Sequence, residues 1–297
     1  MSDVGWSFVK GHGTGNDFVV LPDPTGALEL TPSVVAALCD RRTGIGADGV
    51  LRVVPTVLVP PMQLRAAADD AGIRDVEWFM DYRNADGTLA EMCGNGVRVF
   101  VAYLVAAGLV SAPGGLRVAT RAGVRDVVVH DDGAVTVRMG PATFPGPERV
   151  EVQVRDGAPT WWPAVAVDVG NPHAVVFVDD LADPGPLRTA PTVRPLQAFP
   201  DGVNVEFARI VGPGHAAMRV HERGVGETQS CGTGACAVFA AARQRVGPDS
   251  PTTWTIDVPG GRLVVAAADD GELELTGPAV LVASGTVDAS WLDAVRP

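Results

Sequence analysis

The chain has 297 residues, of which 46% are hydrophobic, and a formal net charge of −12 at pH 7. Its length favours two domains, and its acidity argues against nucleic-acid binding, which requires a basic face. The longest apolar run, 99–110, is too short to cross a bilayer, and residues 1–10 lack the pattern of a secretion signal. The four cysteines have no C-x-x-C spacing, so we expect reduced thiols in a cytoplasmic protein that binds neither nucleic acid nor membrane.

The first third of the chain alternates short strands with glycine-rich turns. Thr31 followed by Pro32 is typical of an N-cap and a first helical position, and predicts a short helix that ends at Cys39. Residues 55–75 contain prolines and charges and predict no particular element. The predicted strands in this third are 7–10, 18–21, 50–54 and 76–82.

Two segments begin with the same pattern, Cys-Gly-x-Gly, at Cys93 and at Cys231. Each continues in an almost wholly apolar run, which predicts two buried helices, 94–108 and 232–245, with a cysteine at each N-terminus. Unpaired N–H groups at such a terminus suit a substrate carboxylate, and the helix end favours thiolate over thiol.

The remainder of the chain reads as strands of period two, and the two halves correspond. Hairpin strands are expected at 124–130 and 135–139, and further strands at 161–169, 174–178, 203–210 and 217–221, with three or four more after the second helix. Asn16 and Asn171 begin similar segments, and Asn84 and Glu222 each lie nine residues before a cysteine. We therefore predict an internal duplication of strands wrapped on a central helix, with a ligand cleft between the copies.

Two cysteines related by an approximate two-fold axis would approach one carbon from opposite sides. One thiolate could remove a proton from one face while the opposing thiol delivers a proton to the other, which inverts the carbon. A helix terminus contributes only about 0.3–2 kcal/mol to this chemistry, so closure of the domains over the substrate is expected to supply most of the barrier reduction. The backbone N–H groups expected to hold the adjacent carboxylate are those of Gly94, Asn95, Gly232 and Thr233.

Other interpretations of the cysteines remain. Cys-Gly-x-Gly can be an ordinary turn into a buried helix, and Cys39 and Cys236 are taken as buried structural residues. Cys231 and Cys236 are five residues apart on one helix and point in different directions, so no metal site is expected.

The chain resembles diaminopimelate epimerases in a series of ordered motifs that spans nearly its whole length. These motifs are Asn84-Ala85-Asp86-Gly87, Glu91-Met92-Cys93-Gly94-Asn95-Gly96, Gly170-Asn171-Pro172-His173, Gly202-Val203-Asn204-Val205-Glu206 and Glu222-Arg223-Gly224-Val225-Gly226-Glu227-Thr228. The resemblance implies a metal-free epimerase that uses no pyridoxal phosphate or other cofactor. Such an enzyme interconverts LL- and meso-diaminopimelate for lysine and peptidoglycan synthesis, as a homodimer.

The resemblance also implies a fold and residue roles. The fold is α+β, with two pseudo-symmetric domains, each a curled, mostly antiparallel sheet around a central buried helix. The expected domains are 1–124 with 278–297, and 125–277. Cys93 and Cys231 would be the acid/base pair, supported by His173 and Glu222. The substrate-binding residues would be Asn16, Asn84, Gly94, Asn95, Asn171, Asn204, Glu222, Arg223, Gly232 and Thr233.

One departure and three rival functions follow from the same residues. Many family members carry Gln where this chain has Gly49, so a substrate contact is in doubt there. A proline racemase-like enzyme is the first rival, although Arg223, Asn84 and Asn204 suit a substrate with a second polar end. A thiol redox protein with a switchable Cys93–Cys231 disulfide and a catalytically inactive binding protein are the others.

Overall fold

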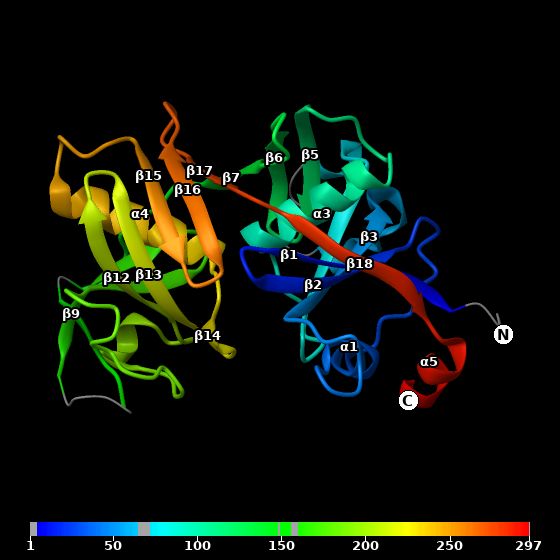
Figure 1. The fold of residues 1–297 in the computed structure, drawn as a ribbon, viewed down its shortest axis with the longest axis horizontal. Coiled ribbons are helices and arrows are strands. Elements are labelled where there is room, and N and C mark those ends of the chain that lie inside the picture. The colour runs from blue at the N-terminus through cyan, green and yellow to red at the C-terminus, as the bar shows by residue number, and fades with distance from the viewer. Residues whose placement is uncertain (1–4, 65–71, 148, 156–159, 297) are drawn as a thin grey trace. The chain divides into compact units, whose positions relative to one another are not determined.

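A computed structural model describes the chain except for residues 1–4, 65–71, 148, 156–159 and 297 (Figure 1). The chain divides into two compact units, Met1–Val137 with Pro278–Pro297, and Arg138–Gly277. The boundary lies later than the division after residue 124 expected from the sequence. That earlier point falls inside the strand β6, which pairs with β5 on one side and β7 on the other and so stays with the N-terminal unit.

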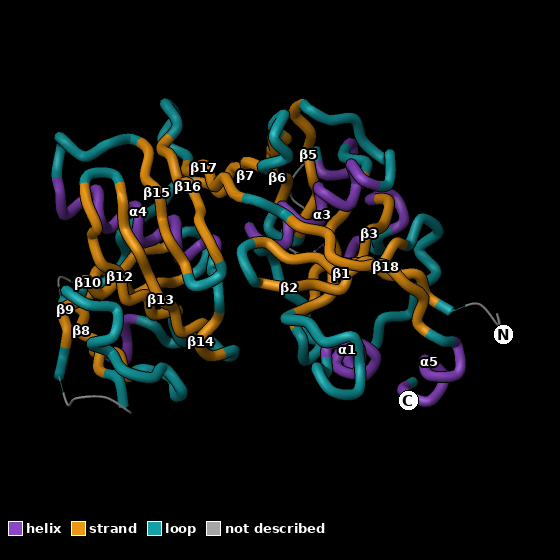
Figure 2. Tube along the Cα trace, viewed as in Figure 1, coloured by secondary structure: helices purple, strands orange, loops and turns teal. Residues whose placement is uncertain are grey.

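The N-terminal unit is one twisted sheet with a central helix (Figures 1 and 2). The pairings run in the order β18, β1, β2, β3, β4, β5, β6, β7, in which β2/β3 and β4/β5 are parallel and the other neighbours antiparallel. These strands are β1 (Trp6–Gly13), β2 (Asn16–Pro22), β3 (Gly49–Pro55), β4 (Trp78–Asn84), β5 (Gly114–Thr120), β6 (Gly123–Val129), β7 (Val135–Gly140) and β18 (Val280–Val287).

The C-terminal unit repeats the same pattern of strand directions. Its pairings run in the order β8, β9, β10, β12, β13, β15, β16, β17, with β10/β12 and β13/β15 parallel and the others antiparallel. The short strands β11 and β14 add to β8 and β13. The strands are β8 (Val150–Gln153), β9 (Trp162–Asp168), β10 (Pro172–Phe177), β11 (Thr192–Arg194), β12 (Asn204–Gly212), β13 (His215–Glu222), β14 (Gly226–Thr228), β15 (Thr253–Val258), β16 (Gly261–Ala267) and β17 (Leu273–Gly277).

Each sheet curls around one helix, as the sequence predicts. The helix α3 (Gly94–Ala106) contacts β1, β2, β3, β4 and β18, and α4 (Gly232–Val246) contacts β9, β10, β12, β13, β15, β16 and β17. Every residue of α4 from Gly232 to Ala242 is buried, because the sheet covers this helix on several sides. Gly108 and Gly247, with φ of +70° and +88°, lie just beyond the helix ends. The fold is therefore α+β with two pseudo-symmetric units.

The remaining helices are short. In α1 (Pro32–Cys39) the Thr31 side chain accepts a hydrogen bond from Val34 N at 3.3 Å, which confirms the predicted N-cap. The sequence predicted no helix for α5 (Ala289–Val295), which packs against α1. The segment without a prediction, 55–75, forms short turns where it is described; its residues 65–71 lie outside the described part of the chain. These turns and one further turn are η1 (Thr56–Leu58), α2 (Pro61–Leu64), η3 (Ile73–Asp75) and η4 (Leu196–Ala198).

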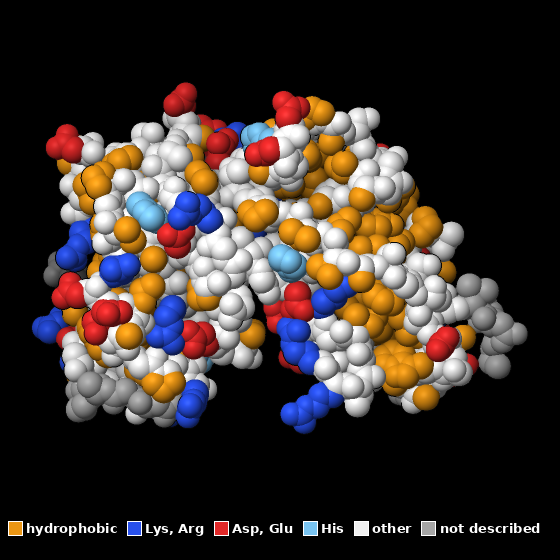
Figure 3. Space-filling model, in the orientation of Figure 1, with side chains coloured by type: hydrophobic (Ala, Val, Ile, Leu, Met, Phe, Trp, Pro, Cys, Tyr) orange, Lys and Arg blue, Asp and Glu red, His pale blue; other side chains and the backbone are white. Residues whose placement is uncertain are grey.

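The surfaces of the two units differ in character. Figure 3 shows Lys and Arg side chains interspersed with Asp and Glu on the visible face of the C-terminal unit, and more exposed hydrophobic side chains on that of the N-terminal unit. On β18, Val280 and Val282 are 42% and 61% exposed. Of the helices that the structure describes, none has both the length and the hydropathy to cross a membrane.

Candidate active site

Strand register aligns the predicted site residues of the two units position by position. The parallel pair β2/β3 places Phe18 opposite Gly49, and β10/β12 places His173 opposite Asn204. Gly49 then pairs with Asn84 on β4, just as Asn204 lies at the end of β12 that adjoins Glu222 on β13. The equivalent positions are Asn16 and Asn171, Phe18 and His173, Gly49 and Asn204, Asn84 and Glu222, and Cys93 and Cys231. Each unit therefore carries its own set of these positions, and we call each set a half-site.

In the N-terminal half-site the cysteine lies among amide side chains. Cys93, half-buried, is the N-cap residue of α3, and its Sγ donates to Asn16 Oδ1 at 3.6 Å. Asn95 Nδ2 donates to the same oxygen at 3.3 Å. Asn16 Nδ2 in turn donates to Asp48 Oδ2 at 2.8 Å, which fixes the orientation of the amide.

A charged network behind Asn16 holds Asp48 in place. Arg41 Nη2 contacts Asp17 Oδ1 at 2.6 Å and Asp48 Oδ1 at 2.8 Å, and Lys10 Nζ contacts Asp17 Oδ2 at 2.6 Å. Burial by itself raises the pKa of Asp17, but the hydrogen bonds from Arg41 and Lys10 outweigh it and lower that pKa to about 2. Neither Asp48 nor Arg41 was a predicted site residue, and the signal in the sequence was the position of Asp48 beside Gly49.

The turn that leads from β4 toward Cys93 carries Asn84. Asn84 Nδ2 donates to Thr88 Oγ1 at 3.0 Å, so its side chain closes the turn. Buried Arg121 donates from Nη1 to Tyr82 O at 2.9 Å and to Ala90 O at 3.3 Å, and so holds both ends of this segment. Gly49 packs tightly against the same strand, because an added Cβ would lie 2.5 Å from Arg83 O. A side chain at residue 49 would therefore require β4 to move.

In the C-terminal half-site the cysteine lies among ionisable side chains. Cys231 is the buried N-cap residue of α4, and its Sγ accepts from Gly234 N at 3.3 Å and lies 3.4 Å from Thr233 Oγ1. Burial, together with the charges of Glu222 and Glu206, raises the pKa of Cys231 well above its usual value, although the bonds from Thr233 and Gly234 lower it. The geometry therefore favours a protonated Cys231 thiol.

A histidine completes this half-site. His173 is fully buried, with Nδ1 2.7 Å from Glu206 Oε1 and Nε2 2.9 Å from Asn171 Oδ1. His173 and Asn171 were both predicted site residues, whereas Glu206 was part of a quoted motif without an assigned role. The structure places Glu206 two residues beyond Asn204 on the same face of β12.

The other predicted residues of this half-site are bound to their own loop. Asn204 Oδ1 accepts from Arg223 N at 3.0 Å, and its Nδ2 donates to Pro172 O at 3.2 Å. The guanidinium of Arg223 donates to Asp201 O at 3.0 Å, and Glu222 Oε1 accepts from Thr228 Oγ1. Asn204 thus joins the ends of β10, β12 and β13.

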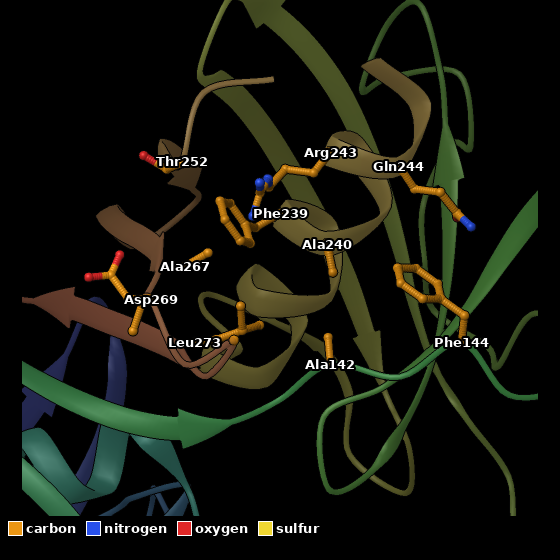
Figure 4. A pocket seen from close by; sticks show the side chains of 12 residues that line it. Ala142, Phe144, Phe239, Ala240, Arg243, Gln244, Thr252, Ala267, Asp269 and Leu273 are labelled. Carbon is orange, nitrogen blue, oxygen red and sulfur yellow. The ribbon is translucent and has the colours of Figure 1, made fainter. Parts of the chain in front are cut away.

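Two hollows in the C-terminal unit lie outside the helix start. One, of about 530 Å³, lies beside the C-terminal half of α4, and its lining includes Phe239, Ala240, Arg243, Phe144 and Leu273 (Figure 4). No predicted site residue lines it. A smaller hollow of about 210 Å³ includes His221 and Arg223. No group of three His, Cys, Asp or Glu side chains that could hold a metal ion occurs within the described ranges.

Comparison with solved structures identifies the fold class. A PhzF-family phenazine biosynthesis protein of Bacillus anthracis matches with a TM-score of 0.68 at 17% identity, over 97% of this chain and 99% of the other. A hydroxyproline epimerase of Agrobacterium vitis matches with a TM-score of 0.63 at 17% identity, over 96% and 94% of the two chains. At such identities the likeness establishes the fold alone, and the chain has the two-unit fold of this class.

Within that class, the family follows from the sequence comparisons. The model of the family described as "Diaminopimelate epimerase" matches residues 8–145 and 165–282. The diaminopimelate epimerase of Streptomyces coelicolor is 55% identical over 97% of this chain and 98% of its own length, and that of Thermobifida fusca 50% identical over 96% and 99%. The chain belongs to the diaminopimelate epimerase family and is an isomerase, as the resemblance of its motifs implied.

Proposed function

We propose that this enzyme interconverts LL- and meso-diaminopimelate by a two-base mechanism in which Cys93 and Cys231 exchange protons with one substrate carbon. The main support is that a cysteine is the N-cap residue of the buried helix in each of the two units. The chain is also 55% identical to a diaminopimelate epimerase. An enzyme of this reaction takes part in lysine biosynthesis and needs no cofactor.

The proposed step conserves atoms and protons. A thiolate takes the α-proton, so that the C–H bond breaks and an S–H bond forms, while the opposing thiol gives its proton to the other face of the carbon. The two sulfurs exchange protonation states in each turnover. The raised pKa of Cys231 supports a resting enzyme in which Cys231 carries a proton that it can deliver. His173 and Glu222 assist these transfers.

The substrate carboxylate next to the reacting carbon would be held by N–H groups of the two helix starts. In α3 and α4, Val97 N and Ala235 N donate to the N-cap carbonyls of Cys93 and Cys231, and the N–H groups that precede them point out of the helix start. We assign this role to the N–H groups of Gly94, Asn95, Gly232 and Thr233. We assign binding of the amino and distal carboxylate groups to Asn16, Asn84, Asn171, Asn204, Glu222 and Arg223.

The first test is incubation with LL-diaminopimelate in deuterated water. The wild type should incorporate deuterium at the inverted carbon, while Cys93→Ala and Cys231→Ala should each lose epimerisation. Cys236→Ala is the matched control, since Cys236 is fully buried one turn further along α4. Full epimerisation by either active-site variant would rule out the two-base scheme.

Parallel incubations separate the rivals. Inversion of proline in place of diaminopimelate would favour a proline racemase-like activity, and thiol-dependent turnover of a protein partner without deuterium incorporation would favour a redox role. We further propose a cytoplasmic homodimer. Light scattering on the purified chain tests the dimer, and a monomeric mass at micromolar concentration would contradict it.

A further inference from the structure

The start of α3 packs over an apolar pair. Gly96 lies one turn into the helix, and an added Cβ there would come within 3.3 Å of Leu51 Cδ2 and 3.6 Å of Phe18 Cζ, with Cys93 Cβ at 3.5 Å. Phe18 and Leu51 are both fully buried. The space under the N-terminal cysteine is thus filled by two hydrocarbon side chains.

The start of α4 packs over an ionisable pair in the equivalent space. Gly234 is the counterpart of Gly96, and an added Cβ there would lie 2.8 Å from Glu206 Oε1 and 3.2 Å from Cys231 Cβ. His173 and Glu206 take the places of Phe18 and Leu51 in the parallel strand pair, and both are likewise fully buried.

The two copies share one fold but differ in these two residues, so the fold itself does not require an ionisable pair at this place. The N-terminal unit shows that the strand pattern and the helix start form over hydrocarbon. A buried carboxylate is costly unless every oxygen is paired, and within the described chain Glu206 Oε2 is buried without a hydrogen-bond partner. Stability therefore does not account for Glu206, whereas a role beside Cys231 does.

We propose that Glu206 is a positioning residue of the acid–base site, which holds the proton of His173 on Nδ1 and thereby fixes the ring with Nε2 toward Asn171. Nδ1 lies 2.7 Å from Glu206 Oε1, and Nε2 lies 2.9 Å from Asn171 Oδ1. With its proton on Nδ1, the ring has an acceptor at Nε2, so the Asn171 amide turns its NH₂ group toward Nε2 and donates to it. Without Glu206, the imidazole can change tautomer or rotate, and the orientation of the Asn171 amide is no longer determined. This inference rests on the proposed function, since it assigns His173 a part in proton transfer.

A double-mutant cycle on the full-length enzyme tests it. Glu206→Gln keeps the size of the side chain, and the pair His173→Phe with Glu206→Leu reproduces the residues of the N-terminal unit and should fold. We expect Glu206→Gln and Glu206→Leu each to lower kcat about tenfold or more, a part of the roughly 10²–10⁴ that a positioned proton-transfer group contributes. Glu206 itself contacts no proposed substrate group, so kcat should fall by a larger factor than KM rises. Glu151→Gln, a surface glutamate paired with Arg149 and Arg194, is the matched control and should keep full kcat.

The cycle has decisive outcomes. If Glu206 acts through His173, Glu206→Leu should have no further effect in the His173→Phe background. An equal loss of kcat in both backgrounds would overturn the proposal, as would a Glu206→Gln enzyme with wild-type kcat.

Nitrogen-15 NMR of the His173 ring gives a second readout, assigned by its loss in His173→Phe. We expect a protonated Nδ1 in the wild type and a changed tautomer or faster proton exchange in Glu206→Leu. An unchanged ring spectrum would refute the positioning role. Because the NMR measurement needs no turnover, it still decides the contact if diaminopimelate proves not to be the substrate.

Discussion

Replacing Asp81 by Asn should strongly destabilise the N-terminal unit, because one carboxylate neutralises several buried guanidiniums. Asp81 is 1% exposed, and it contacts Arg83 Nη2 at 3.1 Å, Arg52 Nη1 at 3.5 Å and the Nη2 of Arg121. Arg52 would keep Asp23 at 2.6 Å, but Arg121 would keep no carboxylate partner among the ion pairs of the described residues, only two backbone carbonyls and the Phe79 ring. Removing one partner of a buried ion pair costs about 3–5 kcal/mol, a large part of the roughly 5–15 kcal/mol that stabilises a typical fold.

The assay is urea denaturation combined with hydrogen exchange read by mass spectrometry. Protection should fall in β3 and β4, and in the segment between Tyr82 and Ala90 that Arg121 holds, while β12 and β13 stay protected. Asp257→Asn is the control with the same charge change, because Asp257 pairs with His215 and Arg262 at the surface and should cost about 1 kcal/mol or less. If Asp81→Asn shifted the denaturation midpoint no more than this control, the inference about the buried cluster would be refuted.

The same cluster predicts a dependence on pH. Burial by itself raises the pKa of Asp81, but the charges of Arg121 and Arg83 outweigh it and hold that pKa below 3.8. The stabilisation is therefore complete above the unfolded-state pKa and is lost as the pH falls through the lower folded-state pKa. The difference in stability between wild type and Asp81→Asn should narrow in acid, and a difference that stayed constant or grew on acidification would contradict this assignment.

Three further predictions concern the helix starts and the thiols. Gly234→Ala should lower the free energy of unfolding by about 1–3 kcal/mol, because the new Cβ would lie 2.8 Å from a buried carboxylate oxygen. Gly96→Ala, whose new Cβ would lie 3.3 Å from its nearest atom, should lower it less in the same denaturation measurement. Equal losses in the two variants would show that the helix start relaxes freely. Thr31→Ala removes an N-cap and should lower the free energy of unfolding by about 0.5–2 kcal/mol, measured by thermal unfolding. An unchanged unfolding midpoint would show that the Thr31 side chain does not stabilise the helix. Iodoacetamide at pH 8 should label half-buried Cys93 before Cys39, whose burial raises its pKa to about 12; peptide mapping that found Cys39 first would contradict the structure.

Local signals account for what could be predicted from the chain alone. The cap at Thr31 and the glycines after α3 and α4 act within a few residues, so their patterns are legible in sequence. The repeated Cys-Gly-x-Gly and the nine-residue spacing from Asn84 and Glu222 to a cysteine likewise indicated the duplication. Where local patterns were weak the predictions fell short. We expected strands at 7–10 and 18–21, but β1 extends to Gly13 and β2 begins at Asn16, so only two residues separate them.

Contacts between distant residues were decided only by the tertiary structure. Asp48 reaches Asn16 and Glu206 reaches His173 because β2/β3 and β10/β12 pair in parallel. Such a pairing joins strands whose partners lie 31 residues apart, and its register is set by packing on both faces of the sheet rather than by any local pattern. The amino-acid sequence by itself determined the two helix starts and the cysteine at each of them. Which side chains lie beneath each cysteine depended on strand pairing, because only folding brings these remote residues into contact.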